Sequence, residues 1–135
     1  MRHLEDSLQL AVADYLRLQY PSLLWWHTAN GMYASGDKKK RGQTVNRFKR
    51  MGMRPGVADI VMFWEGVFPS WGGGIPFPRM GAIELKTGKN NLQDNQVVFR
   101  KDWMLAGGLY AVCRSVDDVQ RQLEEWCVPK GRASQ

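Results

Sequence analysis

Two carboxylates stand in positions where apolar side chains are expected. Asp59 precedes the run Ile60-Val61-Met62-Phe63, and Glu84 follows Ala82-Ile83, whereas most other carboxylates lie on predicted helix surfaces. Burial of an unpaired carboxylate costs several kcal/mol, so a chain that keeps two of them in neighbouring strands is expected to supply a cation. Two carboxylates, a main-chain carbonyl and water form an oxygen-rich site that suits Mg²⁺ or Mn²⁺.

Lys86 adds a third chemical group to this pair. Side chains two positions apart in a strand project to the same face, so Glu84 and Lys86 point together. They point toward Asp59 if the two strands pair in the right register. A metal at such a site polarises a scissile phosphate and activates water, and a nearby ammonium orients that water or neutralises charge in the transition state. The residue types therefore suit metal-assisted hydrolysis of a phosphodiester.

Periodicity predicts the elements that must position these groups. Apolar residues at helical spacing predict a first helix over residues 4–19, which Pro21 ends. Asn91 as N-cap predicts a second helix, which Gly107-Gly108 ends, and a capping box at Ser115 and Asp118 opens a last helix. Short apolar runs predict four strands, over residues 23–27, 57–64, 80–86 and 109–113.

Two connections are less regular. Residues 28–56 carry turn signals and a dense run of cations, with a short cationic helix expected over 43–51. The Gly- and Pro-rich insert 65–79 is interpreted as a long loop between two strands, with two extended hairpin arms as the alternative. The α-β-β-β-α-β order predicts an α/β fold with a mixed central sheet flanked by helices. Residues 1–135 are expected to form one domain, with a flexible tail at 129–135.

Composition bounds the class of protein. The chain has 135 residues, 44% of them hydrophobic and 24% charged, as in ordinary globular domains, and its formal net charge is +6. This excess favours a polyanionic partner, either nucleic acid or an acidic membrane surface. Eight of its 19 Lys and Arg residues lie in one stretch, and we expect them to contact DNA phosphates: Lys38, Lys39, Lys40, Arg41, Arg47, Lys49, Arg50 and Arg54.

Cysteine usage and apolar runs indicate a compartment. Cys113 and Cys127 form no CxxC pair, so neither a disulfide framework nor a zinc site is expected, and a reducing compartment is the simplest interpretation. The N-terminus becomes charged too early for a signal peptide, and no apolar run approaches the ~20 residues of a membrane span. We expect a cytoplasmic protein that has no membrane partner.

The acidic and basic positions together resemble a known signature. Gly56-Val57-Ala58-Asp59, a spacer and Glu84-Leu85-Lys86 are similar to the PD-(D/E)xK nuclease superfamily. More closely, the chain resembles a stand-alone virus-type replication-repair nuclease (VRR-Nuc) domain, because Arg54 to Asp59 is similar to its RPGxPD-like signature. Two departures stand out. Ala58 occupies the place of the signature proline, and the insert 65–79 lengthens the link between the two catalytic strands.

The resemblance spans residues 5 to 126. Its other supports are Glu5 at the acidic position of the first helix, His27 to Gly31 at the His–Asn segment, Gln96 at the helical glutamine, and Gly107-Gly108 before the last strand. It implies a restriction-endonuclease-like core and a set of roles. Asp59, Glu84 and the Leu85 carbonyl would bind Mg²⁺, for which Mn²⁺ would substitute, and Glu5 would join them directly or through water. Lys86 would assist the attacking water, and Gln96 would position Lys86 or the scissile phosphate. His27 and Asn30 would contact substrate.

The family's reaction is phosphodiester hydrolysis that leaves a 5′-phosphate and a 3′-hydroxyl. Relatives of the stand-alone type are associated with homodimers that cut branched DNA such as four-way (Holliday) junctions, and two symmetric nicks need two sites. The resemblance therefore implies a structure-selective DNA endonuclease with a role in DNA repair. It also implies a bacterial or phage origin, in the cytoplasm of a bacterium or an infected host.

Each feature also has a plainer interpretation. Asp59 is alternatively a strand-edge aspartate bonded to a turn amide, and Glu84 with Lys86 an exposed cross-strand charge pair. Glu5 and Gln96 are alternatively solvated helix residues. For His27 the alternative is a hydrogen-bonded histidine at a strand end, and for Asn30 it is turn chemistry with Gly31, while the basic stretch is alternatively a solvated face.

Four other functions follow from these interpretations. They are a catalytically silent DNA-binding module of the same fold, a nuclease that acts on RNA, a nuclease that acts on unbranched DNA, and a basic scaffold protein. Cleavage assays on matched DNA and RNA substrates separate the first three, and metal-linked stabilisation is expected of a nuclease but not of a scaffold.

Overall fold

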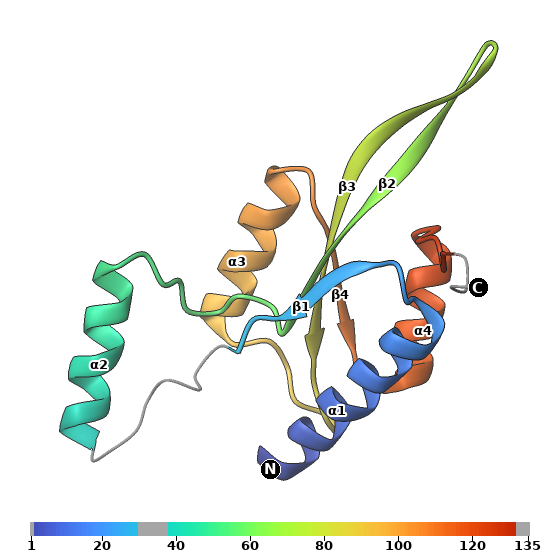
Figure 1. The fold of residues 1–135 in the computed structure, drawn as a ribbon. Helices are drawn as coiled ribbons and strands as arrows, with labels where there is room; N and C mark the ends of the chain where they lie inside the picture. The colour runs from blue at the N-terminus through green and yellow to red at the C-terminus, as the bar shows by residue number, and fades with distance from the viewer. Residues whose placement is uncertain (1, 30–37, 132–135) are drawn as a thin grey trace.

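The computed structural model describes residues 2–29 and 38–131 (Figure 1). It contains eight helices and strands within these ranges: α1 (Arg2–Gln19), β1 (Leu24–His27), α2 (Lys38–Arg50), β2 (Ile60–Ser70), β3 (Gly73–Leu85), α3 (Asp94–Leu105), β4 (Leu109–Cys113) and α4 (Val116–Glu125). No helix of the described part is both long and apolar enough to cross a membrane. The expected tail 129–135 lies outside the described residues from position 132 onward.

The strands form one mixed sheet in the order β1-β2-β3-β4. β1, β2 and β3 pair antiparallel, and β4 runs parallel to β3 after the crossover through α3. Helices α1 and α4 cover one face of the sheet and α3 covers the other (Figure 1). The predicted α/β fold with a mixed central sheet flanked by helices is confirmed.

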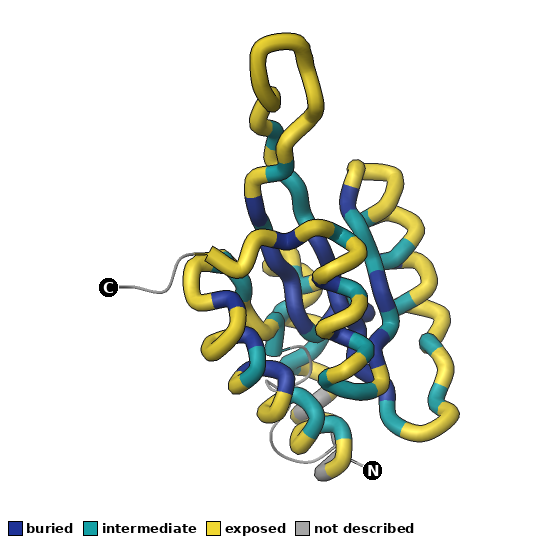
Figure 2. Tube along the Cα trace, turned by 90° about the vertical axis from the view of Figure 1, so that its right-hand side faces the viewer, coloured by how far each residue is buried: buried dark blue, intermediate teal, exposed yellow. Residues whose placement is uncertain are grey.

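The sheet is buried on both faces only at its centre. On one face Ile60, Met62 and Ile83 pack against α1 and α4 in the larger core cluster. On the other face Val61 and Ala82 pack against Phe99 of α3. Figure 2 shows the buried stretches of chain in this central region, with exposed backbone at the far end of the hairpin. Alternation along each strand thus divides the core between the two helical layers.

β2 and β3 continue well past the sheet as a two-stranded arm, defined here as residues 65–78 (Figure 1). The expected long loop at 65–79 is therefore wrong, and the alternative of two extended hairpin arms is correct. Pro69, Pro76 and Pro78 all fall in alternate pairs of the ladder, opposite residues 74, 67 and 65. In an antiparallel ladder alternate positions direct their N–H groups away from the partner, so a proline there removes no hydrogen bond.

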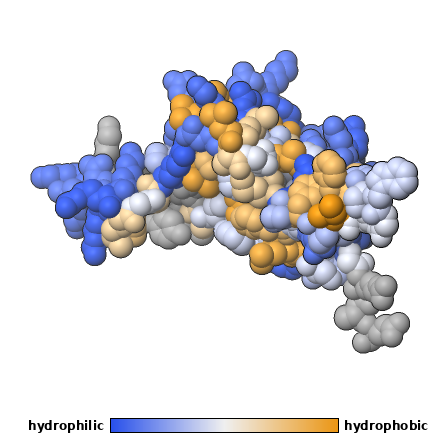
Figure 3. Space-filling model, turned by 90° about the horizontal axis from the view of Figure 1, so that it is seen from above, coloured by the Kyte–Doolittle hydropathy of each residue, from blue (hydrophilic) through white to orange (hydrophobic). Residues whose placement is uncertain are grey.

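Helix α2 stands apart from the sheet at the left of Figure 1. It begins five residues before the predicted helix 43–51 and ends at Arg50. Lys39, Lys40, Arg47 and Arg50 are exposed and fall within about 100° of one another around a helix of 3.6 residues per turn. The hydrophilic projection at the left of Figure 3 corresponds to this helix, which therefore presents a cationic face.

Candidate active site

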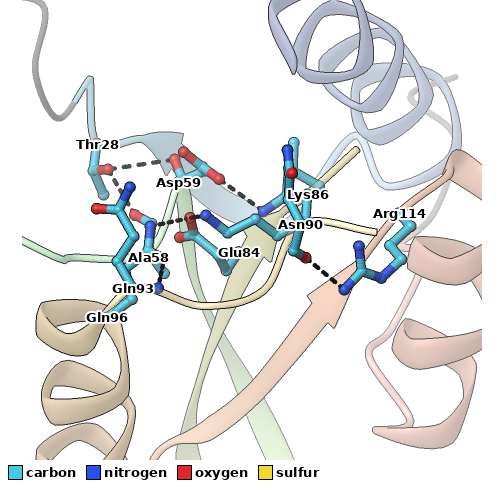
Figure 4. Close-up of polar contacts among 10 residues, drawn as sticks. Thr28, Ala58, Asp59, Glu84, Lys86, Asn90, Gln93, Gln96 and Arg114 are labelled. Atoms are coloured by element: carbon cyan, nitrogen blue, oxygen red, sulfur yellow. Dashed lines mark hydrogen bonds and ion pairs between the residues drawn. The ribbon is translucent and has the colours of Figure 1, made fainter. Parts of the chain in front are cut away.

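The register of the two central strands brings Asp59 to Glu84. Ile60 pairs with Ile83, so Asp59, one residue earlier, comes beside Glu84. The backbone N–H of Leu85 donates to Asp59 Oδ2 at 2.7 Å (Figure 4). This bond holds the Asp59 carboxylate at the end of the sheet where Glu84 and Lys86 also lie, as Figure 4 shows. β2 and β3 thus pair in the register that brings Asp59, Glu84 and Lys86 together.

The end of β1 fixes the backbone on which Asp59 sits. The Thr28 N–H donates to the Asp59 carbonyl at 2.9 Å, and the Thr28 hydroxyl donates to the Ala58 carbonyl at 2.6 Å. His27 Nδ1 lies 2.7 Å from the same Asp59 carbonyl. In this structure the His27 ring is thus bound to protein backbone at a strand end. Thr28, to which sequence pattern assigns no role of its own, carries two of these contacts.

The Arg-Pro-Gly segment before Asp59 is fastened to α3. Arg54 Nη2 lies 2.6 Å from Asp102 Oδ2, and its guanidinium lies over the Phe99 ring. Gly56 has a φ of +81°, and a Cβ at this position would come within 2.4 Å of the Asn95 carbonyl oxygen. Only glycine tolerates both conditions. The segment therefore delivers Asp59 to the site, and Arg54 is engaged by protein groups.

Glu84 and Lys86 are almost completely enclosed. Their relative exposures are 3% and 6%, and Lys86 Nζ lies 3.7 Å from Glu84 Oε1. The interpretation of this pair as an exposed cross-strand charge pair is therefore wrong. Both project from the face of β3 that α3 covers, as the alternation with the inward-facing Ala82 requires.

Gln96 connects this pair to the start of α3. Its Nε2 donates to Glu84 Oε1 at 2.7 Å, and its Oε1 accepts from the Gln93 N–H at 2.8 Å (Figure 4). The helix N-cap is Gln93, so the prediction of Asn91 is wrong. The two contacts fix which end of the Gln96 amide faces the carboxylate. The alternative interpretation of Gln96 as a solvated helix residue is therefore wrong.

These groups open into a cleft of about 610 Å³ between α1, α3 and the segment before β2. Its walls include Glu5, Asp59, Glu84, Lys86 and Gln96, together with the amide-bearing residues Asn90, Asn91, Gln93 and Asn95. Glu5 of α1 thereby faces the same cleft as the half-buried Asp59 and the buried Glu84.

Burial and mutual repulsion dominate the electrostatics of the cleft. Burial, followed by the Asp59 charge, raises the pKa of Glu84 to about 8, although Lys86 opposes the shift. Burial also raises the pKa of Asp59, against the lowering effect of the Leu85 N–H and of His27. Each carboxylate therefore resists ionisation beside the other, and Lys86 alone does not compensate both.

The donor set suits a small divalent cation. Glu84 Oε2 is buried and has no hydrogen-bond partner among the described residues. An unpartnered carboxylate oxygen beside a second carboxylate is stabilised by a cation, and all-oxygen donors are those that Mg²⁺ and Mn²⁺ prefer. Within the described ranges no three His, Cys, Asp or Glu side chains converge on one point. Any cation here would complete its shell with backbone oxygen, water or substrate.

The remaining predicted contact residues are dispersed. Lys39, Lys40, Arg47, Lys49 and Arg50 are exposed on α2, which reaches the cleft wall through Val45. Lys38 and Arg41 lie in the same helix. Asn30 falls outside the described residues. None of the exposed α2 cations belongs to the wall of the cleft.

Arg114 is a residue of the site environment that sequence pattern did not indicate. It donates to the Gly88 carbonyl at 2.8 Å and to the Asn90 carbonyl at 2.7 Å, the latter contact drawn in Figure 4, and so anchors the loop that lines the cleft. Leu85 pairs with Cys113 in the parallel ladder, so Lys86 and Arg114 follow their strands at one edge. The signal that predicts this placement is the crossover through α3, because it makes β3 and β4 parallel neighbours.

Comparisons with known proteins support the fold. A solved structure described as a "VRR_NUC domain protein" superposes with a TM-score of 0.59 and 19% sequence identity, over 91% of this chain and 87% of that one. The sequence matches no protein-family model and no curated protein. The chain therefore has a VRR-Nuc-like fold, of the restriction-endonuclease-like class, and at this level of identity the likeness concerns the fold.

Proposed function

We propose that this protein is a nuclease that hydrolyses DNA phosphodiester bonds with the help of a divalent cation. One observation carries the proposal: Asp59, Glu84 and Lys86 meet in an open cleft, where Glu84 Oε2 is buried without a partner among the described residues. The VRR-Nuc-like fold of the chain and the nuclease domain name of its structural neighbour support this activity. The cationic face of α2 supports a polyanionic substrate.

Each group of the cleft has a role in this proposal. Asp59, Glu84 and the Leu85 carbonyl would hold Mg²⁺ or Mn²⁺, and Glu5, across the cleft, would act through water. Such a cation would supply Lewis acidity toward the phosphate and favour ionisation of the attacking water. Lys86 orients the attacking water or offsets transition-state charge.

Gln96 holds Glu84 in place through its amide, and the bonds of Thr28 keep the Asp59 backbone in register. These two residues position the carboxylates and need not touch the substrate. This differs from the role that the resemblance implies for Gln96, which is to position Lys86 or the scissile phosphate.

The experiment compares cleavage of labelled four-way junction, flap, single-stranded and linear duplex DNA, and of matched RNA, in Mg²⁺, Mn²⁺ or EDTA. Glu84→Gln keeps the shape and the Gln96 contact but removes the charge, and we expect it to abolish cutting while it spares binding. Glu65→Gln is the matched control, because Glu65 is exposed at the base of the arm. Binding without metal-dependent cutting on every substrate would leave a DNA-binding module, and preferential cutting of RNA would change the substrate class.

We propose further that the protein acts as a homodimer on branched DNA. Residues 66–78 of the arm carry no charged side chain, and Val67, Phe68, Trp71 and Ile75 are exposed there. An isolated two-stranded hairpin is marginally stable in water, and an exposed apolar patch marks an interaction site. A contact through this uncharged surface lets two copies of net charge +6 associate without opposing like charges there.

A further inference from the structure

A second pocket adjoins the catalytic cleft beside the N-terminal part of α3. It measures about 400 Å³ and is lined by Asn91, Leu92, Val97, Arg100, Val112 and Arg114. Asn91 also lines the catalytic cleft, so the two hollows share a wall at this loop. This pocket has no role in the proposed function.

Its charged groups are both cationic, and half of its lining residues are apolar. None of the six described lining residues is acidic, and neither Arg100 nor Arg114 forms an ion pair within the described part of the chain. Val97, Val112 and Leu92 supply apolar surface between the guanidinium groups. A pocket of this kind suits a phosphate with an attached sugar, because guanidinium groups bind phosphate oxygens in pairs while the sugar contacts the apolar side chains.

The two arginines reach the pocket from different elements: Arg114 follows β4, and Arg100 lies in α3. Arg114 is fixed by the carbonyls of Gly88 and Asn90, which orient its guanidinium before any ligand arrives. Arg100 lies four residues after Gln96, so it projects from nearly the same side of α3 about 6 Å further along the axis. The pocket therefore extends the path of a strand that occupies the cleft.

We infer that this pocket binds a neighbouring phosphodiester of the DNA strand whose scissile phosphate lies at Asp59 and Glu84. The inference rests on the proposed function and adds the course of the strand, which crosses the loop at Asn91 to reach Arg100 and Arg114. Binding at two phosphates orients the strand in the cleft, which presents the scissile bond to Lys86 in one direction only.

Arg100→Ala tests this pocket, because Arg114 also anchors the loop and its loss would disturb the cleft. Lys101→Ala is the matched control: it removes one charge from the same helix about 100° away, outside both hollows. DNA affinity is measured in EDTA by fluorescence anisotropy across a salt series. Loss of one phosphate contact reduces the salt-dependence slope by about 0.9 for duplex DNA, which corresponds to about fivefold weaker binding at 0.15 M salt relative to a 1 M reference.

A neutral phosphate then locates the contact. Oligonucleotides carry one methylphosphonate at the first or second phosphate on either side of the scissile bond. At one of these positions the wild-type protein should lose affinity, and Arg100→Ala, which retains only the Arg114 contact, should lose less there than the wild type does. Equal effects of Arg100→Ala and Lys101→Ala, or additive losses at all four positions, would overturn the inference. Wild-type cleavage in Mg²⁺ is assayed in parallel, so a protein that cuts DNA but fails this test refutes the pocket and leaves the proposed function standing.

Discussion

Glu84→Gln should make the metal-free protein more stable, and increasingly so as the pH rises. The pKa of Glu84 is raised from 4.5 to about 8 by burial and by the Asp59 charge, so the folded protein keeps this proton to higher pH than the unfolded chain does. The free energy of unfolding then falls as pH rises from about 4.5 to about 8. Below that window the group costs nothing, and above it the full cost is present.

The size of the effect follows from the shift. One bound proton gives a slope of at most about 1.4 kcal/mol per pH unit, so the window corresponds to about 5 kcal/mol in total and about 3 kcal/mol at pH 7. Glutamine carries no charge and keeps the contact with Gln96. The stability difference between the variant and the wild type should therefore be near zero at pH 4.5 and reach its plateau above pH 8.

Urea unfolding in EDTA, followed by tryptophan fluorescence between pH 4.5 and 9, measures this difference. Glu65→Gln, an exposed substitution, should give a small difference that does not vary with pH. Addition of Mg²⁺ should stabilise the wild type most at high pH and leave Glu84→Gln nearly unchanged, because the cation neutralises the same repulsion. A difference independent of pH, or a variant less stable than wild type at pH 8, would refute the assignment of a repelled, buried carboxylate.

Three further predictions concern the elements around the site. Gly56→Ala should lower the free energy of unfolding in urea more than Gly52→Ala does, because both glycines have positive φ but only Gly56 lies against backbone atoms of α3. The strained φ alone costs roughly 1–2 kcal/mol at either position. Equal losses in the two variants would contradict the close approach of Gly56 to α3. Thr28→Val should lower the free energy of unfolding by about 1 kcal/mol and lower kcat, because the Ala58 carbonyl loses a donor; unchanged cleavage would remove Thr28 from a positioning role. Trp71→Ser should shift the protein toward monomer in light scattering if the arm forms the dimer contact, and a wild-type monomer at all concentrations would refute the dimer.

Several features of the site are predictable because they depend on local pattern. An acidic residue inside an apolar strand is rare for an energetic reason, so Asp59 and Glu84 are conspicuous in the amino-acid sequence alone. The period of two in a strand places Glu84 and Lys86 on one face. Ser115 is recognisable as an N-cap from its own side-chain chemistry, and its hydroxyl accepts from the Asp118 N–H at 3.0 Å.

Other features depend on neighbours distant in the chain. The insert 65–79 has the composition of a loop, because Gly and Pro weaken strand signals. In a two-stranded ribbon, however, alternate N–H groups form no hydrogen bond with the partner strand, so prolines at those positions are compatible with pairing. The contact of Gln96 with Glu84 is likewise non-local, because it forms only once the sheet and α3 are packed together.

By itself, then, the sequence determined the α/β pattern, the two carboxylates of the site and the lysine beside them, because each rests on periodicity or on the cost of burying charge. Only the tertiary structure decided the register that joins Asp59 to Leu85, the fastening of Arg54 to Asp102, and the place of Arg114 at the cleft. These contacts link residues 24 to 48 positions apart. They depend on how the strands and helices pack against one another, which local spacing alone does not specify.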